Sequence, residues 1–230
     1  MKKILGLLLG TLLLVGCLDM GEPAKERAFD VSDLFLPLDV FPENWQEVGD
    51  VRPMGPDSSI GIGDPDDAYI SYKVRQAPTN LAYYYVYWNE YTGSAESWFN
   101  RTLKTDFSDG RVSIAVPWNT PDELSYRSAH ADKFHVACAT LEMVGRKLVC
   151  KVIAQYEEFG VMFHSVIRPD ALTLEQFNTL VCQIDAVFVA RLELSDEPID
   201  CQSSGSATAK ALDKVVWFAG RNTIPQLSQE

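Results

Sequence analysis

The stretch from residue 134 to residue 167, FHVACATLEMVGRKLVCKVIAQYEEFGVMFHSVI, decides the fold. Branched, aromatic and other apolar residues fill three segments of it, and turn residues separate them at 144–145 and 159–160. This pattern predicts three strands, at about 124–140, 147–156 and 161–167, joined as an antiparallel meander.

The first turn of this meander also predicts its register. A three-residue loop with Gly145 in the left-handed conformation pairs Glu142 with Arg146. Counting outward from that pair places Cys138 opposite Cys150, so a cross-strand disulfide is geometrically feasible. The two cysteines share their face of the sheet with four apolar residues: Phe134, Val136, Val152 and Ala154.

Two helices are expected beside these strands. The first begins after the N-cap candidate Ser94 and ends at Asp109 and Gly110, and its apolar residues recur at i, i+3, i+4, i+7 and i+8. They are Ala95, Trp98, Phe99, Thr102 and Leu103.

The second helix has the clearer start signals and ends near Leu192. Thr173 and Gln176 form a capping box, and Leu172 and Phe177 form a hydrophobic staple. Its apolar face consists of Phe177, Leu180, Val181, Ile184 and Phe188.

Further strands are expected at 68–74 and 81–90, with loops at 53–67 and around the prolines at 117 and 121. Two amphipathic helices interrupting runs of strands predict an α+β fold, in which a mainly antiparallel sheet packs against both helices as an α/β/α sandwich. This layout over about 40–192 is similar to that of the Mog1/PsbP-like family. The resemblance rests on no diagnostic motif, so it implies a fold and carries no functional residue.

The N-terminal segment has the features of an export signal. Lys2 and Lys3 precede an apolar run from residue 4 to residue 15, which is too short to span a bilayer. The sequence then reads Leu-Val-Gly-Cys at 14–17, which resembles the lipobox of bacterial lipoproteins. The resemblance implies transfer of a diacylglycerol to the thiol of Cys17, cleavage before Cys17, and acylation of the new amine with a fatty acid such as palmitate. An ordinary secretory signal or an uncleaved anchor is the alternative.

This interpretation divides the chain into four parts. Residues 1–16 are a signal peptide, 17–30 a lipidated tether with little apolar content, 31–194 the α+β domain, and 195–230 a C-terminal extension packed on the domain or tethered to it. The expected location is the extracytoplasmic face of a membrane or envelope.

Four cysteines remain once Cys17 is assigned to lipidation. An even number in an oxidising compartment is typical of two disulfides, for which three connectivities exist. If Cys138 pairs with Cys150, elimination pairs Cys182 with Cys201 and ties the C-terminal tail to a helix. Free thiols or a metal site are the alternatives, although the chain has no CxxC motif and no clustered Cys and His spacing.

Charge excludes one class of partner. Without residues 1–16 the chain has 18 basic and 32 acidic residues, a net charge of −14. Nucleic acids and anionic lipid headgroups are bound through clusters of Lys and Arg, so we expect no nucleic-acid binding. An alternative explanation of the negative charge is that it only keeps the protein soluble.

No familiar catalytic or metal motif is present. His130 and His135 are five residues apart near a strand, which sends them to opposite faces, and neither they nor His164 has the spacing of a metal site. GxSxG, SxxK and HExxH motifs are absent, so no catalytic residue and no cofactor is assigned.

Two loop features resemble binding motifs only in part. Gly61 and Gly63 could begin a phosphate loop, but aspartates follow where an anion would sit. The same acidic loop contains Asp57, Asp64, Asp66 and Asp67, which could collect calcium, yet it lacks the alternating pattern and closing glutamate of a calcium loop.

One strand carries an aromatic row that we consider a candidate binding surface. Tyr83, Tyr85 and Tyr87 share one face of the strand at 81–90, opposite Tyr84 and its neighbours. Exposed, the row would bind a protein, a glycan or an apolar ligand; buried, it would belong to a central strand. Three functions remain open: a non-catalytic domain that binds or scaffolds an envelope protein, a small-ligand binder with a tyrosine-lined pocket, and an enzyme with a dispersed site.

Overall fold

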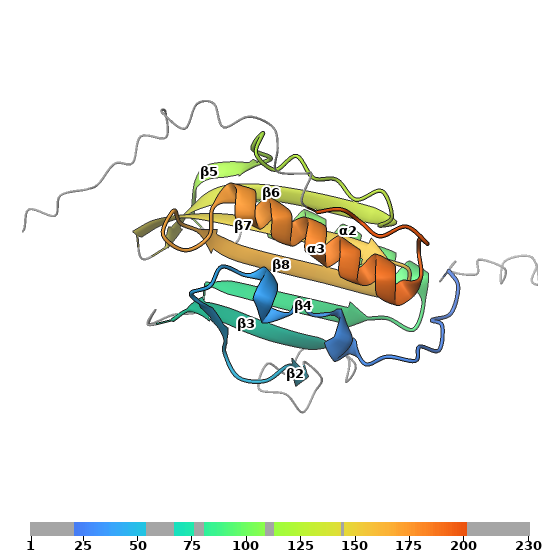
Figure 1. Cartoon of the computed structure of the whole chain (residues 1–230). Coiled ribbons are helices and arrows are strands. Elements are labelled where there is room, and N and C mark those ends of the chain that lie inside the picture. Colours follow the sequence, from blue (N-terminus) through green and yellow to red (C-terminus); the bar gives the residue numbers. More distant parts are fainter. Residues whose placement is uncertain (1–20, 54–66, 76–80, 109–112, 144, 202–230) are drawn as a thin grey trace, which may run out of the picture.

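The computed structural model describes residues 21–53, 67–75, 81–108, 113–143 and 145–201, and within these ranges eight strands form one antiparallel sheet (Figure 1). The helices and strands run in this order: η1 (Val31–Leu34), η2 (Leu38–Val40), β1 (Trp45–Glu47), β2 (Arg52–Pro53), β3 (Ala68–Val74), β4 (Ala82–Trp88), α2 (Thr92–Asp106), β5 (Ile114–Asn119), β6 (Lys133–Met143), β7 (Gly145–Tyr156), β8 (Phe159–Ile167) and α3 (Leu174–Leu192).

The predicted meander forms the middle of this sheet. The strand order is β1-β3-β4-β8-β7-β6-β5, with β2 pairing β3 beside β1. In the β6–β7 hairpin Glu142 lies opposite Arg146 and Cys138 opposite Cys150, which confirms the predicted register. Gly145 has a φ of +82°, the left-handed conformation that the turn requires.

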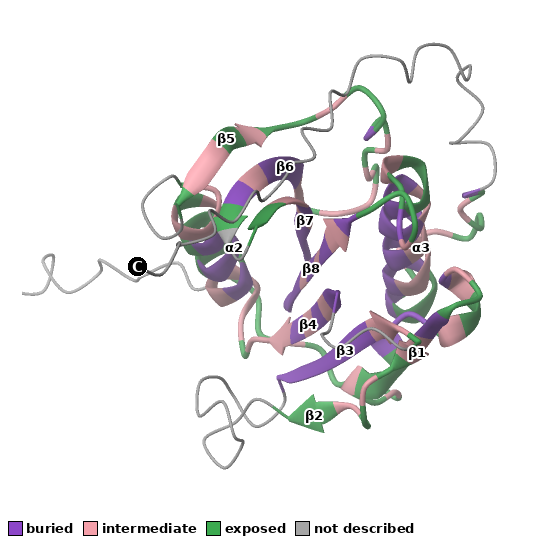
Figure 2. Cartoon of the chain, turned by 90° about the vertical axis from the view of Figure 1, so that its left-hand side faces the viewer, coloured by how far each residue is buried: buried purple, intermediate pink, exposed green. Residues whose placement is uncertain are grey.

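The two long helices cover opposite faces of the sheet (Figure 2). Helix α2 packs over β6, β7 and β8 on one face, and α3 packs over β7 and β8 on the other, where it also contacts η1. The α+β fold class with its three layers is therefore confirmed.

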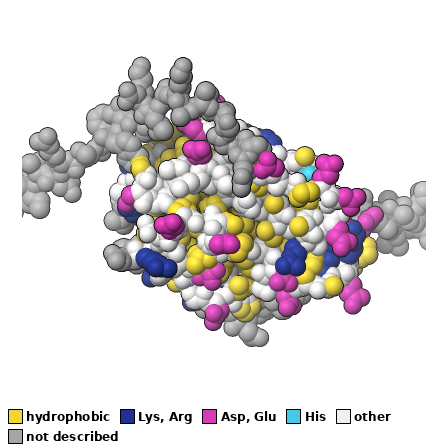
Figure 3. Space-filling model, in the orientation of Figure 1, with side chains coloured by type: hydrophobic (Ala, Val, Ile, Leu, Met, Phe, Trp, Pro, Cys, Tyr) yellow, Lys and Arg dark blue, Asp and Glu magenta, His cyan; other side chains and the backbone are white. Residues whose placement is uncertain are grey.

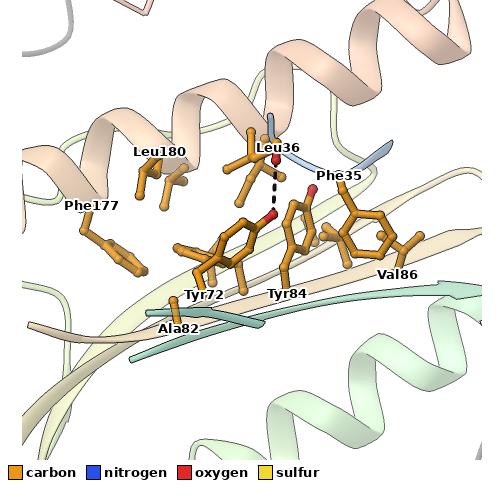
Figure 4. Close-up of a cluster of buried hydrophobic side chains, with 14 of the residues drawn as sticks. Phe35, Leu36, Tyr72, Ala82, Tyr84, Val86, Phe177 and Leu180 are labelled. Carbon is orange, nitrogen blue, oxygen red and sulfur yellow. Dashed lines mark hydrogen bonds between the residues drawn. The ribbon is translucent and has the colours of Figure 1, made fainter. Parts of the chain in front are cut away.

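The main core lies between the sheet and α3. Leu172 and Phe177, the predicted staple, are fully buried, and Thr173 and Gln176 form the predicted capping box. Figure 4 shows Tyr72 and Tyr84 rising from the sheet toward this helix and the segment after η1. The hydroxyl of Tyr72 donates to the carbonyl of Leu36, and that of Tyr84 donates to the carbonyl of Leu34 at the end of η1. Both buried hydroxyls therefore have a hydrogen-bond partner.

Helix α2 begins three residues earlier than predicted. Its N-cap is Tyr91, and Ser94 lies within the helix. The predicted stripe is otherwise correct, because Ala95, Trp98, Phe99 and Thr102 are all buried. Trp98 lies directly over Gly160, where an added Cβ would come within 2.5 Å of the indole ring.

Three predicted boundaries in the meander were wrong. Residues 121–132 form an irregular segment packed by Leu124 against the α3 side, and β6 begins only at Lys133. The expected loop around Pro117 is instead the edge strand β5, which tolerates a proline because its outer side has no strand to bond. The second turn lies at 157–158, where Glu157 has a φ of +50°.

Two short strands at the opposite edge were not predicted. β1 and β2 both pair with β3, and Trp45 of β1 is buried with its indole N–H donating to the carbonyl of Ala171. Strands of two and three residues contain too little alternation to be recognised from a pattern.

The described part of the segment predicted to be a tether lies on the domain. Residues 21–27, which we call the strap, run beside the start of α2, where Pro23 forms a bridge with Tyr91. Ion pairs join Arg27 to Glu157 and Glu158 in the β7–β8 turn. The low apolar content of these residues predicted a free segment, but ion pairs hold the strap on the domain.

Candidate functional site

The aromatic row predicted on β4 exists. Tyr83, Tyr85 and Tyr87 are half-buried, whereas Ala82, Tyr84 and Val86, which point toward α3, are fully buried. Successive tyrosine rings of the row are 6.4 and 6.3 Å apart and nearly parallel, with interplanar angles of 18° and 15°. The row is therefore neither sealed in the core nor fully exposed.

Residues of neighbouring strands extend the row sideways. Tyr69 of β3 stacks on Tyr85 at 5.7 Å, and the imidazole of His164 on β8 lies 5.3 Å from Tyr83 and 5.9 Å from Tyr85. Tyr87 meets Trp98 of α2 at 4.7 Å. The result is an aromatic surface on the α2 side of the sheet, beside that helix.

This surface carries hydroxyls but little charge. Burial, followed by the neighbouring Tyr83, raises the pKa of Tyr85 to about 12, and burial also raises the pKa of Tyr87. The pKa of His164 falls to about 3, first through burial and then through the positive charge of Lys151. At neutral pH these side chains are uncharged, which suits contact with an apolar or aromatic partner.

The nearest charges are paired with each other. Lys151 of β7 lies opposite His164, and its ammonium binds Asp106 at the end of α2 at 2.9 Å. The same ammonium lies 5.6 Å from the ring centroids of both Phe107 and Trp118. Lys151 and its partners thus cover this face of the sheet at the C-terminal end of α2.

The three histidines do not form a metal site with other described residues. His135 packs against Phe107 at 4.6 Å and His164 against the aromatic row, while His130 lies in the irregular segment and bonds through its backbone to Ser128. Within the described ranges no group of three or more His, Cys, Asp or Glu side chains could hold a metal ion.

A buried carboxylate on α3 escaped the sequence analysis. Asp185 is fully buried and accepts hydrogen bonds from the hydroxyls of Tyr126, of Tyr156 at 2.7 Å and of Ser128 at 2.7 Å. The cluster fastens the irregular segment at 121–132 to α3. Because the carboxylate has no access to solvent and its donors are all structural, we interpret it as part of the core.

Both predicted disulfides are present. Cys138 is joined to Cys150 across the β6–β7 hairpin, and Cys182 of α3 is joined to Cys201. All four residues are buried. Disulfides are typical of extracytoplasmic compartments, so this finding fits the expected location.

Two hollows lie at the strap, and the tyrosine row lines neither. One, of about 440 Å³, is lined by strap residues, the start of α2 and the β7–β8 turn. The other, of about 510 Å³, lies between the strap and the edge formed by β2 and β3. The predicted tyrosine-lined pocket is therefore not among them.

Several predicted features cannot be placed. Cys17 and the lipobox lie outside the described residues, as do Gly61, Gly63 and three of the four loop aspartates, namely Asp57, Asp64 and Asp66. Asp67 is described; it is buried, and its carboxylate accepts the backbone N–H of Trp88 at 2.8 Å. That aspartate serves to fix the end of β4.

The surface visible in Figure 3 carries side chains of both charges. On the side shown in Figure 3, Lys and Arg side chains lie singly among acidic ones and form no continuous basic surface. Among the described helices, none is long and apolar enough to cross a bilayer.

Comparison with known proteins adds no functional label. No protein-family model matches the chain, and neither does any curated protein or solved structure.

Proposed function

We propose that this protein is a bacterial lipoprotein, anchored through Cys17 on the extracytoplasmic side of a membrane, whose domain binds or scaffolds another envelope protein. The lipobox-like leader supports the anchor. The two disulfides support an oxidising location, because reducing compartments keep such thiols free. The domain is the binding part of this arrangement.

The observation that carries the binding role is the aromatic row on β4. Four stacked tyrosines and a neutral histidine lie side by side on one sheet face, and Tyr83, Tyr85 and Tyr87 retain partial exposure. Tyrosine is enriched in protein interfaces, since its ring supplies contact area and its hydroxyl supplies a hydrogen bond at a low entropy cost. A row held on the central sheet is also preorganised.

The anchor is tested by metabolic labelling with a clickable fatty acid. The wild-type protein should be labelled and recovered with membranes, and Cys17→Ala should be unlabelled. Cys201→Ala, which removes a cysteine from the domain but leaves Cys17 intact, is the matched control and should still be labelled. Equal labelling of wild type and Cys17→Ala would refute the anchor.

The binding surface is tested by site-specific photocrosslinking in intact cells. A photoreactive amino acid at Tyr83 or Tyr85 should give a reproducible crosslinked band, whereas the same group at Val116 should not. Val116 is a suitable control because it is an exposed apolar residue, 47% accessible, on the edge strand β5. Bands of equal strength from Val116, or none from the row, would remove the row from the proposal.

A further inference from the structure

The strap is held on the domain as far back as Gly21. The backbone N–H of Glu22 donates to the hydroxyl of Thr92 at 3.0 Å, and the N–H of Thr92 donates to the carbonyl of Glu22 at 2.9 Å. Gly21 has a φ of +75°, and a Cβ on it would lie 2.3 Å from the Thr92 hydroxyl oxygen. Gly21, the first residue that the structure describes, is therefore fixed beside the start of α2.

Ion pairs hold the other half of the strap. The guanidinium of Arg27 binds Glu158 at 2.7 Å and also contacts Glu157, and the ammonium of Lys25 contacts Glu157. Arg27 and Glu158 have side-chain exposures of 15% and 1%, so releasing the strap would leave a buried carboxylate unpaired. The strap is thus a fixed part of the domain.

A short connection limits how far this end can lie from the anchor. Only three residues, 18–20, separate Cys17 from Gly21, and the four Cα–Cα steps between the two span at most about 14 Å. The opposite end of the sheet, at the β6–β7 hairpin, is much farther away, because β6 runs from Lys133 near the strap to Met143, a length of roughly 33 Å. In Figure 1 the strap and this hairpin lie at opposite ends of the molecule.

We infer that the end of the domain formed by the strap, the start of α2 and the β7–β8 turn is a docking surface for the bilayer, and that it contacts zwitterionic rather than anionic headgroups. The inference rests on the proposed lipid anchor at Cys17. A headgroup layer is only about 5–8 Å thick, so a tether of three residues places this end against it.

The net negative charge of the strap end of the domain favours zwitterionic over anionic lipid headgroups. Its carboxylates outnumber its cations; the acidic side chains are Glu22, Glu26, Glu90, Glu96, Asp132, Glu157 and Glu158, and the basic ones are Lys25, Arg27 and Lys133. An anionic leaflet would repel such a surface across a Debye length of about 8 Å at physiological salt. A zwitterionic leaflet carries no net charge, and its ammonium groups can meet the carboxylates.

The test uses the acylated full-length chain in vesicles with a nitroxide quencher in the headgroup layer. A fluorescent amino acid replaces Glu90 at the strap end or, as the matched control, Glu142 at the hairpin; both are exposed glutamates. In choline-headgroup vesicles, quenching should be strong at Glu90 and weak at Glu142. Equal quenching at the two positions, or stronger quenching at Glu142, would overturn the inference.

Two further measurements separate docking from mere proximity. Replacing part of the lipid with an anionic one should lower the quenching at Glu90 at low salt, and salt should restore it. Inserting twelve Gly and Ser residues after Met20 should lower the quenching at Glu90 toward that at Glu142, because a flexible linker of about fifteen residues reaches about 19–23 Å. Unchanged quenching in the anionic vesicles would refute the headgroup preference, and unchanged quenching in the long-linker variant would refute the role of the short tether.

Failure of the inference is distinguishable from failure of the proposed function. If the fatty-acid label is absent from wild-type protein, the anchor is wrong and with it the premise. If the label is present but Glu90 and Glu142 are quenched alike, the anchor stands and only the orientation is wrong.

Discussion

The two faces of the sheet differ in how completely their polar atoms are satisfied. On the α3 face, the hydroxyls of Tyr72 and Tyr84 donate to backbone carbonyls at 3.1 and 3.0 Å, and three further hydroxyls surround Asp185. On the α2 face, three buried polar atoms have no hydrogen-bond partner among the described residues. They are Trp118 Nε1, Gln155 Oε1 and His164 Nδ1.

Unsatisfied buried polar atoms are uncommon in native proteins and each one calls for an explanation. The α3 face needs none, because its core is closed and its polar atoms are paired. The α2 face combines the three unpaired atoms with a half-buried aromatic row. This difference teaches that the α3 face is a closed and fully paired core, while the α2 face combines unpaired buried polar atoms with a partly exposed aromatic row.

The largest expected losses of stability come from side chains buried at the centre of each face. Phe188→Ala, on the α3 face, and Trp98→Ala, on the α2 face, should each lower the free energy of unfolding by about 3–5 kcal/mol, because both side chains are buried in clusters. Urea denaturation measures the change. Val116→Ala, at an exposed edge, should change it by less than about 0.5 kcal/mol. An unchanged midpoint in Trp98→Ala would contradict the packing of α2.

The Asp185 cluster gives the next largest effect. Asp185→Asn keeps the shape but replaces charge-assisted hydrogen bonds with neutral ones and turns an amide N–H₂ toward hydroxyls, which should cost about 2–3 kcal/mol. Asp122→Asn, on an exposed part of the same irregular segment, is the control for loss of charge. If both variants unfold at the wild-type midpoint, the cluster does not stabilise the α3 face.

Local signals in the sequence were sufficient for much of the α3 face. The capping box at Thr173 and the hairpin register around Gly145 depend on residues a few positions apart, and both were predicted correctly. Asp185 was missed because its donors lie 29 to 59 residues away, where a periodic pattern carries no information.

The same reason explains what was missed on the α2 face and at the strap. Alternation along β4 predicted that Tyr83, Tyr85 and Tyr87 share a face, but the exposure of that face depends on where α2 packs. The strap was taken for a free tether because its anchoring partners, Glu157 and Glu158, lie about 130 residues further along the chain.

Removing polar side-chain atoms from each face tests the comparison directly. Tyr84→Phe deletes a hydroxyl and leaves the carbonyl of Leu34 unpaired in the core, so it should cost about 1–2 kcal/mol. His164→Phe keeps an aromatic ring beside Tyr83 and Tyr85 but removes an unpaired nitrogen, so at pH 7 it should be neutral or slightly stabilising. Equal losses in the two variants would mean that the faces do not differ in this respect.

The smallest expected effect is a pH dependence that belongs to the α2 face. The pKa of His164 is lowered to about 3 in the folded protein, first by burial and then by Lys151, while Asp106 acts in the opposite direction. The facing side chains of Tyr83 and Tyr85 contact its ring. The unfolded chain takes up this proton near pH 6.5 and the folded chain does not, so stability is full above that pH and is lost as the pH falls toward 3.

Because His164 as a whole residue keeps partial exposure, we expect a loss of about 1 kcal/mol between pH 7 and pH 5. His164→Phe should flatten this slope, and the residual slope should belong to His135, whose pKa is also lowered by burial and by Arg127. Urea midpoints at pH 7, 6 and 5 measure both variants. If His164→Phe keeps the full wild-type slope, His164 is not held neutral by the α2 face, and the electrostatic half of the comparison is wrong.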